Sequence, residues 1–394
     1  MSRFFSHINS AIKILDAYQG DKPFAIFLKQ FFASNKKYGS KDRKSIASIC
    51  FHYFRMGKTF TNIPIEEKLL IATFLCEKTD SLLMQELRPD WNEKISLSIS
   101  EKLNLLGQNI SLLDFFPFTD LLSSDIEKEA YSLSMLIQPD LFIRIRPKSK
   151  DTVINQLQQS GFHWQLLNEH CVRLKNSDKI ADFFKLDKEL VIQDANSQKV
   201  LDFLKQPGLL ENSVANNTLS VWDCCAASGG KSILLTDVLD QKIDLTVSDI
   251  RETILTNLHE RFKSAGIIEY ESFVTDLSSS DNKMIHKDFD LIICDAPCSG
   301  SGTWGRTPEQ LVFFKKTSLQ YYAELQKKIV ANAITHLKPG GLLVYITCSV
   351  FKVENEMAVN FITESLECKL LDQQMLKGYQ QQSDSMFVAV FKKG

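Results

Sequence analysis

Residues 219–239 have the sequence LSVWDCCAASGGKSILLTDVL, in which a short apolar run is followed by small residues and then by a second apolar run. Leu219 to Trp222 predicts a strand, and Ile233 to Leu239 predicts a helix. The paired glycines between them let a ligand approach the backbone, and the helix start offers unpaired N–H groups. This strand-to-helix turn indicates an α/β protein with a nucleotide site.

The same turn excludes two common kinds of nucleotide site. A P-loop requires glycine at the position of Cys225, and the turn is not a G-x-G-x-x-G segment. A triphosphate is therefore not the expected ligand. Since paired glycines after a strand also occur in unrelated α/β proteins, other residues have to identify what this turn binds.

Aspartates follow the predicted strands. Asp249 comes after Leu245 to Ser248, about twenty residues beyond the glycine turn, where a carboxylate can bind both hydroxyls of a ribose. Asp276 comes after Phe273 and Val274, and we expect it to meet an adenine amino group. A single aspartate at a strand end is more often a helix cap. Four strand-end aspartates make a shared ligand the better explanation: Asp223, Asp249, Asp276 and Asp295.

Two cysteines also follow predicted strands. Cys298 comes after the apolar run Phe289 to Cys294, and Cys348 comes after the run Leu342 to Ile346. Such runs predict parallel strands covered on both faces, and ligands of these sheets bind at the carboxyl ends of the strands. Carbon 5 of cytosine is too electron-poor to attack a methyl donor until a thiolate adds to carbon 6. One cysteine can supply this thiolate, and the other can help the product leave.

Most free cysteines have no such role, because they pack as small hydrophobic side chains. That explanation suits Cys50, Cys76 and Cys294. No two of the nine cysteines have C-x-x-C spacing, so no zinc or other metal site is expected. Nine scattered cysteines without a signal peptide favour a reducing cytoplasm as the location.

Length and composition are typical of a soluble globular protein. The chain has 394 residues, of which 44% are hydrophobic and 24% charged, and this length suggests two or three domains. No apolar run approaches the roughly twenty residues of a membrane span. We expect a monomer that does not associate with membranes.

The net charge of −2 conceals a basic front end. Residues 1–60 contain eleven Lys or Arg against three Asp, which suits phosphate binding, and nearby aromatic side chains are candidates for base stacking. Apolar residues at helical spacing predict helices over residues 8–15, 24–32, 46–54 and 65–76, so the charges can also be an ordinary solvated helix surface. The stacking candidates are Phe4, Phe5, Tyr38 and Phe54.

Together the motifs resemble those of the RNA (cytosine-5)-methyltransferases of the Sun/Fmu or RsmB-like type. Residues 223–232 look like the family's S-adenosylmethionine loop, and DAPCSGSG at 295–302 is similar to its cysteine-bearing fourth motif. Residues 337–356, which contain TCS and ENE, resemble the sixth motif. FIRIRP at 142–147 and QDANSQ at 193–198 look like the segments that precede the catalytic domain.

The resemblance implies an α/β fold in three parts. A Rossmann-like methyltransferase domain with a mixed seven-stranded sheet is expected at residues 201–394, and a small RRM-like α/β module at residues 126–200. A helical, NusB-like RNA-binding domain is expected at residues 1–125, because Tyr38 to Arg43 is similar to part of that domain. Ribosomal RNA is the implied partner, with tRNA as the alternative.

The resemblance also implies roles for individual residues. Cys348 would add to carbon 6 of the cytosine, Cys298 would assist removal of the carbon 5 proton, and Asp295 would hold the amino edge of the base. Lys231 would either lower the pKa of a nearby thiol or neutralise neighbouring carboxylates. The residues expected to bind S-adenosylmethionine are Cys225, Ala226, Ala227, Ser228, Gly229, Gly230, Lys231, Asp249, Asp276 and Asp295.

This sequence departs from the family pattern in three places near these motifs. Ser228 stands where the family usually has proline, and residues 303–309 offer only Arg306 where the family often has paired arginines. The sequence therefore does not predict whether the loop at residues 303–309 contacts RNA. Residues 351–353, FKV, replace a commoner version that contains proline, and no catalytic group is lost.

Two other functions fit part of the pattern. In a DNA cytosine methyltransferase, the Pro-Cys pair at Pro297 and Cys298 would carry the nucleophile, although the second cysteine and the basic helical front end favour RNA. A catalytically idle RNA-binding assembly factor would keep the fold, but it would be expected to have lost a cysteine or an acidic cofactor ligand. This chain has lost neither.

Overall fold

The computed structural model of the chain describes residues 3–107, 110–205, 218–240, 243–279 and 286–394. The chain divides into two compact units. Unit 1 consists of residues 1–122, 127–138 and 303–315, and unit 2 consists of residues 123–126, 139–302 and 316–394. The segment that begins five residues after Cys298 therefore belongs to unit 1.

Unit 1 is helical and has an aromatic core. The ring of Phe24 lies edge-on to those of Phe54 and Tyr18, with centroid distances of 4.8 and 4.9 Å. Phe313, from the segment 303–315, packs against Tyr18 at 5.2 Å. The helices are α1 (Arg3–Ala17), α2 (Phe24–Ser34), α3 (Ser40–Arg55), α4 (Ile65–Cys76), α5 (Leu82–Leu87), α6 (Pro89–Asn92), α7 (Ile99–Leu105), η1 (Leu112–Phe115), η2 (Thr119–Leu121), α8 (Lys128–Ser134) and α12 (Gln310–Phe313).

Arg55, the last residue of α3, is 1% exposed and joins three segments of unit 1. Its Nη1 donates hydrogen bonds to the carbonyl oxygens of Met135 and Ile137 at 2.9 and 3.1 Å. Its Nη2 donates to the carbonyl oxygen of Gly305 at 2.8 Å. Burial lowers the pKa of Arg55 to about 10, so the guanidinium is still charged at neutral pH and needs these acceptors.

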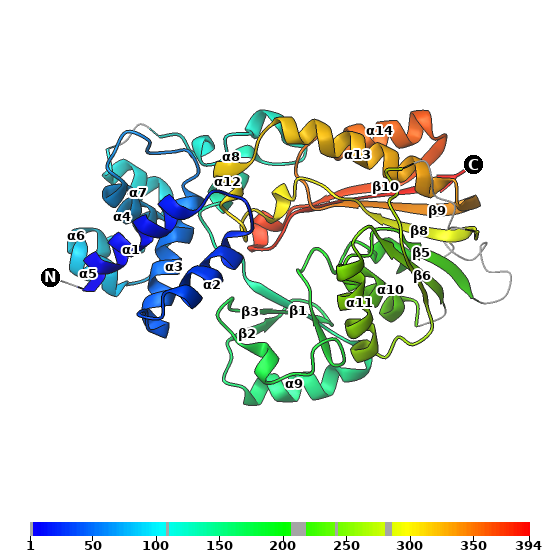
Figure 1. Cartoon of the computed structure of the whole chain (residues 1–394), viewed down its shortest axis with the longest axis horizontal. Coiled ribbons are helices and arrows are strands. Elements are labelled where there is room, and N and C mark those ends of the chain that lie inside the picture. Colours follow the sequence, from blue (N-terminus) through cyan, green and yellow to red (C-terminus); the bar gives the residue numbers. More distant parts are fainter. Residues whose placement is uncertain (1–2, 108–109, 206–217, 241–242, 280–285) are drawn as a thin grey trace. The chain divides into compact units, whose positions relative to one another are not determined.

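Unit 2 is centred on a seven-stranded sheet with the order β10-β11-β9-β8-β5-β6-β7 (Figure 1). Neighbouring strands from β9 to β7 pair in parallel, and β11 pairs antiparallel with both β9 and β10. The strands are β5 (Leu219–Asp223), β6 (Ile243–Asp249), β7 (Glu271–Val274), β8 (Phe289–Asp295), β9 (Leu337–Thr347), β10 (Cys368–Leu376) and β11 (Met386–Lys393).

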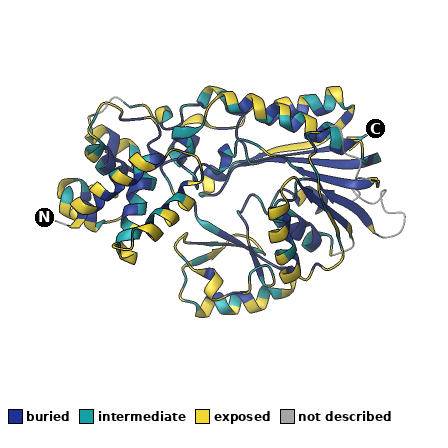
Figure 2. Cartoon of the chain, viewed as in Figure 1, coloured by how far each residue is buried: buried dark blue, intermediate teal, exposed yellow. Residues whose placement is uncertain are grey.

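Helices cover both faces of this sheet. α10 (Gly230–Val238) and α11 (Glu252–Ala265) lie on one face, and α13 (Thr317–Ile334) and α14 (Glu356–Ser365) lie on the other (Figure 1). Every residue of β5 is consequently buried (Figure 2). Short 3-10 turns in unit 2 and at its border are η3 (Pro147–Ser149), η4 (Ile180–Asp182), η5 (Asp202–Lys205), η7 (Ser301–Thr303) and η8 (Gly378–Gln381).

A second, four-stranded antiparallel sheet precedes the large sheet in unit 2. Its order is β2-β3-β1-β4. Arg146 fastens this module to the large sheet by an ion pair with Asp237 of α10 at 2.8 Å, and Arg144 binds the same carboxylate. The elements are β1 (Leu141–Ile145), α9 (Lys150–Gln159), β2 (Trp164–Leu166), β3 (Cys171–Leu174) and β4 (Leu190–Ile192).

The expected fold class is confirmed. The protein combines a helical N-terminal region, a small antiparallel sheet and the seven-stranded mixed sheet typical of S-adenosylmethionine-dependent methyltransferases. Strands predicted from apolar runs correspond to β5, β6, β8 and β9. Neither β10 nor β11 was predicted. β10 is an edge strand with mostly exposed residues and lacks a continuous apolar run. β11 does contain an apolar run, MFVAVF at residues 386–391, which was overlooked.

In the part of the chain that the structure describes, none of the helices is both long and apolar enough to cross a bilayer.

Replacing Arg55 with Met should lower the free energy of unfolding by about 3 kcal/mol or more, because buried carbonyl oxygens lose their donors. Urea unfolding followed by circular dichroism measures this change. Lys58→Met, at an exposed position three residues later, is the matched control and should change the free energy by less than about 0.5 kcal/mol. Equal losses in the two variants would contradict the role assigned to Arg55.

Candidate active site

The carboxyl ends of β5, β8 and β9 form the candidate site. Along the chain, β6 and β7 are added on one side of β5, and β8 and β9 are added on the other side. The direction of sheet growth therefore switches between β5 and β8. Ligands of open α/β sheets bind at such a switch point. The glycine turn and both cysteine loops follow these three strands.

The glycine turn has a backbone that suits close approach of a ligand. Gly229 has a left-handed φ of +80°, and a Cβ atom there would lie 2.5 Å from the ring of Phe262, so glycine is required at this position. α10 starts at the next residue, Gly230, and no side chain caps it. Its first N–H groups are suited to an anionic group such as the carboxylate of an amino acid.

Ser228, which stands where the resemblance predicted proline, is held in place by side-chain hydrogen bonds. Arg261 of α11 donates hydrogen bonds to both the carbonyl oxygen and the hydroxyl of Ser228, each at 3.0 Å. The same guanidinium binds the carboxylate of Asp187 at 2.8 and 3.0 Å. Side-chain hydrogen bonds thus hold the turn at Ser228.

Asp249 lies at the end of β6, facing the turn. Its carboxylate is buried and accepts a hydrogen bond from the backbone N–H of Ala227 at 3.0 Å. It also accepts bonds from the backbone and side chain of Arg251 at 2.9 and 3.0 Å. The side chain of Arg251 is 59% exposed, so it can leave the carboxylate without breaking the core.

Asp276, which the sequence predicts to meet an adenine amino group, is exposed. It lies two residues beyond β7 and accepts hydrogen bonds from the N–H and hydroxyl of Ser278 at 2.8 and 2.6 Å. The N–H of Thr275 donates to the carbonyl oxygen of Asp249 at 3.2 Å, so this loop lies beside the end of β6.

Lys231 and Asp295 form an ion pair of 2.5 Å between the glycine turn and the end of β8. Burial lowers the pKa of Lys231, but the charge and hydrogen bond of Asp295 outweigh burial, so the net pKa is raised. Of the two roles considered for Lys231, neutralising a carboxylate matches this contact. Asp223 is fully buried and accepts a hydrogen bond from Ser232 at 2.6 Å, which makes it part of the turn's internal support.

The sulfur atoms of Cys298 and Cys348 lie 3.3 Å apart. Strands β8 and β9 pair in parallel, with Asp295 opposite Ile346, so the loops after them are neighbours. Both thiols are partly exposed. The pKa of Cys298 is raised, first by its hydrogen bond with Cys348 and then by burial, which favours Cys298 as the partner that keeps its proton.

Glu354 ties the two cysteine loops together. Its fully buried carboxylate accepts hydrogen bonds from the N–H and hydroxyl of Ser299 at 2.8 and 2.6 Å and from the hydroxyl of Ser349 at 2.5 Å. Each serine directly follows a cysteine. Gln326 of α13 adds a fourth bond at 3.3 Å. The ENE motif at residues 354–356 is recognisable in the sequence, but nothing in it predicted this function of Glu354.

Gly302 supports the same arrangement from the other side. Its N–H donates to the carbonyl oxygen of Cys348 at 2.9 Å, and its carbonyl accepts from the N–H of Ser385. A Cβ at Gly302 would lie 2.0 Å from the carbonyl oxygen of Ser385. Residues 300–305 do spell G-x-G-x-x-G, but they form a 3-10 turn and open no helix, so they are not a dinucleotide turn.

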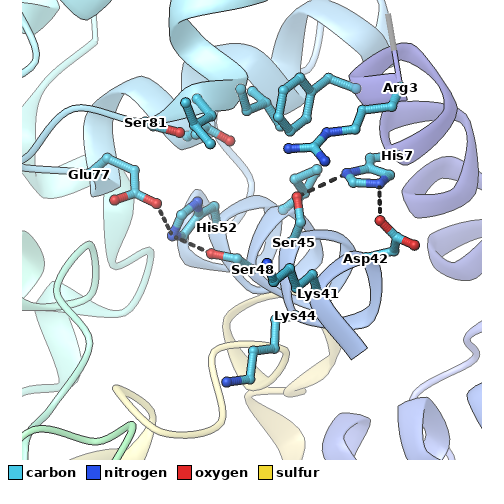
Figure 3. Close-up of a pocket in the computed structure, with 15 residues that line it drawn as sticks. Arg3, His7, Lys41, Asp42, Lys44, Ser45, Ser48, His52, Glu77 and Ser81 are labelled. Atoms are coloured by element: carbon cyan, nitrogen blue, oxygen red, sulfur yellow. Dashed lines mark hydrogen bonds and ion pairs between the residues drawn. The ribbon is translucent and has the colours of Figure 1, made fainter. Parts of the chain in front are cut away.

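A separate pocket of about 480 Å³ lies within unit 1 (Figure 3). The basic side chains of Arg3, Lys41 and Lys44 line it, which gathers part of the basic front end in one place. Two acidic side chains, Asp42 and Glu77, also line the pocket, so its charge is mixed.

Two of the four stacking candidates were wrong. Phe4 and Phe54 are 4% and 2% exposed and belong to the core of unit 1, so neither can stack on a base. Their helices turn these positions inward, which charge counting along the sequence does not reveal. Phe5 is 51% exposed, and Tyr38 is half-buried.

Comparison with known sequences concerns mainly the second half of the chain. Residues 210–391 match the family described as 16S rRNA methyltransferase RsmB/F. A probable ribosomal RNA small subunit methyltransferase B from Bacillus subtilis is 27% identical over 234 residues, which cover 58% of this chain and 50% of that protein. The chain therefore spans about half the length of the curated relatives it matches.

Two solved structures have folds similar to that of this chain. The crystal structure of PH0851 has a TM-score of 0.72 at 17% identity and covers 99% of this chain and 98% of its own. The structure of NSun6 from Pyrococcus horikoshii with SFG has a TM-score of 0.55 at 15% identity and covers 65% of this chain and 91% of its own.

Replacing Glu354 with Ala should slow oxidation of the cysteine pair by diamide at least tenfold, because Ser299 and Ser349 lose their shared acceptor and the loops move apart. Alkylation of the remaining thiols and mass spectrometry of the peptides measure the rate. Glu354→Gln keeps one acceptor oxygen, so its oxidation rate should lie between those of the wild type and Glu354→Ala. Glu356→Ala is the control, since that carboxylate binds Ser123 and Ser124 and should leave the rate unchanged. An unaltered oxidation rate in Glu354→Ala would show that Glu354 does not hold the two cysteine loops together.

Proposed function

We propose that this chain, whose residues 210–391 belong to the RsmB/F methyltransferase family, transfers a methyl group from S-adenosylmethionine to carbon 5 of a cytosine in ribosomal RNA. The thiol pair carries the proposal. Cys298 and Cys348 lie 3.3 Å apart at the carboxyl ends of neighbouring parallel strands. The reaction needs one sulfur to add to the base and a second group to take a proton, and such a pair fits both needs.

The residues around the glycine turn fit S-adenosylmethionine. The uncapped start of α10 suits its carboxylate, and the buried carboxylate of Asp249 suits its ribose hydroxyls once Arg251 has moved aside. Asp276 would lie at the adenine, and the backbone of Cys225 to Lys231 would follow the length of the molecule. When bound, the cofactor supplies an electrophilic methyl group.

The two cysteines would act in sequence. The hydrogen bond that favours protonated Cys298 leaves Cys348 as the sulfur that attacks carbon 6. Formation of this carbon–sulfur bond makes carbon 5 nucleophilic. Once Cys348 is bonded to carbon 6, its hydrogen bond no longer favours the protonated form of Cys298, and Cys298 releases its proton to solvent. After methyl transfer, the Cys298 thiolate takes the proton from carbon 5, the bond from carbon 6 to Cys348 breaks, and Cys348 leaves as a thiolate.

Asp295 would position the base. It lies at the end of β8, and its second oxygen can accept a hydrogen bond from the cytosine amino group while Lys231 holds the first at 2.5 Å. The ammonium group of Lys231 also offsets the negative charge of this carboxylate beside the cofactor.

RNA would present its cytosine unstacked, because carbon 6 cannot be reached inside a duplex. The family description and the name of the Bacillus subtilis relative both specify small-subunit ribosomal RNA, which supports that choice over tRNA. The basic surface of α1 to α3 would bind phosphates. Lys36, Lys37, Lys41 and Lys44 are all exposed.

Cys298→Ala should trap the enzyme covalently on RNA, because Cys348 can still add and the methyl can still move, but the adduct is not resolved. Cys348→Ala and the double variant should form no adduct. A denaturing gel with labelled RNA separates the outcomes. Cys368→Ser is the control, since a hydroxyl can replace the thiol that donates to the carbonyl of Leu366. An adduct in Cys348→Ala but not in Cys298→Ala would assign the nucleophile to Cys298, as in DNA enzymes.

Asp249→Ala should weaken S-adenosylmethionine binding by roughly 2 kcal/mol or more, because ribose hydroxyls lose a buried acceptor. Titration calorimetry measures the affinity. Asp244→Asn, at an exposed position near the start of β6, is the control and should bind as the wild type does. Unchanged affinity in Asp249→Ala would contradict the proposed contact of Asp249 with the ribose hydroxyls.

Charge reversal to Glu at four exposed lysines should weaken RNA binding: Lys36, Lys37, Lys41 and Lys44. It should also reduce the magnitude of the slope of the logarithm of the binding constant against the logarithm of salt concentration by about 0.7 for each lost phosphate contact. Binding to labelled RNA at several salt concentrations gives the slope. Reversing four exposed lysines elsewhere, Lys78, Lys94, Lys263 and Lys328, tests for a mere effect of net charge. If both sets lower the slope equally, the front end has no special role.

A further inference from the structure

A second group of thiols lies at the same end of the sheet. Cys224 and Cys225 follow β5, and Cys294 is the penultimate residue of β8. β5 and β8 pair in parallel (Figure 1), and the N–H of Cys224 donates to the carbonyl oxygen of Ile293 at 3.0 Å. The three sulfur atoms all lie within 4.8 Å of one another.

These distances are close to those of a three-sulfur metal site. With metal–sulfur bonds of about 2.3 Å, a trigonal arrangement places the sulfurs about 4.0 Å apart, so the thiols need only small movements. Within the described part of the chain, no fourth histidine, cysteine or carboxylate ligand atom lies within 4.8 Å of all three. Three thiolates without a fourth ligand suit soft cations better than magnesium or calcium.

The surroundings favour a positive charge. Cys224 and Cys294 are 2% and 0% exposed, and the neighbouring Asp223 is fully buried with one carboxylate oxygen that has no hydrogen-bond partner among the described residues. A bound cation would give this buried oxygen a partner of opposite charge.

We propose that Cys224, Cys225 and Cys294 bind one thiophilic d10 cation, either Cu(I) or Zn(II), in a trithiolate site distinct from the Cys298–Cys348 pair. Each sulfur loses its proton to solvent as its bond to the metal forms, and no electron is transferred. The ion ties the start of the glycine turn to the end of β8. It therefore stiffens the loop to which the proposed function assigns the cofactor, although its binding does not depend on that function.

The test uses the full chain, reduced and then freed of reductant without oxygen. Cu(I) is titrated against bathocuproine disulfonate, and Zn(II) against a chromophoric chelator. We expect one equivalent of at least one ion to bind. Cys224→Ser, Cys225→Ser and Cys294→Ser should each lower the affinity at least a hundredfold. Tight binding of Cu(I) alone indicates a trigonal site, and tight binding of Zn(II) indicates that water completes the coordination.

Two controls separate this site from other thiols. Cys171→Ser, in the small sheet, and the Cys298→Ser/Cys348→Ser double variant should bind the ion as the wild type does. Because a substitution could unfold the turn, X-ray absorption of the loaded wild-type protein gives an independent result. Three sulfurs at about 2.3 Å support the proposal. Absence of stoichiometric binding, fewer than three sulfurs around the metal, or loss of binding only in the double variant would overturn it.

Discussion

Strand β8 pairs in parallel with β5 on one side and with β9 on the other, and this pairing determines which chemical groups of the site can meet. Parallel strands bring their carboxyl ends to the same edge of a sheet. The loop after β8 therefore lies between the glycine turn and the loop that carries Cys348. Both the ion pair of Lys231 with Asp295 and the 3.3 Å approach of the two thiols depend on this order.

Strand pairing alone does not place two thiols within contact distance, because loops can still take many conformations. The buried carboxylate of Glu354 restricts them by accepting hydrogen bonds from the residue after each cysteine. Burial raises the pKa of Glu354, and the serine hydrogen bonds oppose that rise. A buried carboxylate is stabilised only while its donors stay in place, so the loops and the carboxylate hold each other.

The same sheet edge carries two groups of thiols in different surroundings. Cys298 and Cys348 are partly exposed and can meet a substrate, whereas Cys224 and Cys294 are buried under the turn. The hydrogen bond with Cys348, followed by burial, raises the pKa of Cys298, whereas hydrogen bonds with Cys224 and Cys225 lower the pKa of Cys294. Cys294 on β8 and Cys298 in the loop after it can thus have different chemistry, because accessibility and hydrogen-bond partners differ within a few residues.

Sequence alone determined several strands with continuous apolar runs, though not β11, and the turn residues that follow them, because strand formation and backbone approach depend on local residue types. It therefore identified β5, β6, β8 and β9, and it singled out Asp249, Cys298 and Cys348. Tertiary structure decided which distant residues meet: Glu354 with two serines, Arg261 with Ser228, and Cys294 with the cysteines after β5. These contacts join residues 5 to 70 positions apart through strand order and helix packing, and no local pattern encodes such pairings. The burial of Phe4 and Phe54 was likewise decided by packing, since composition does not show which face of a helix turns inward.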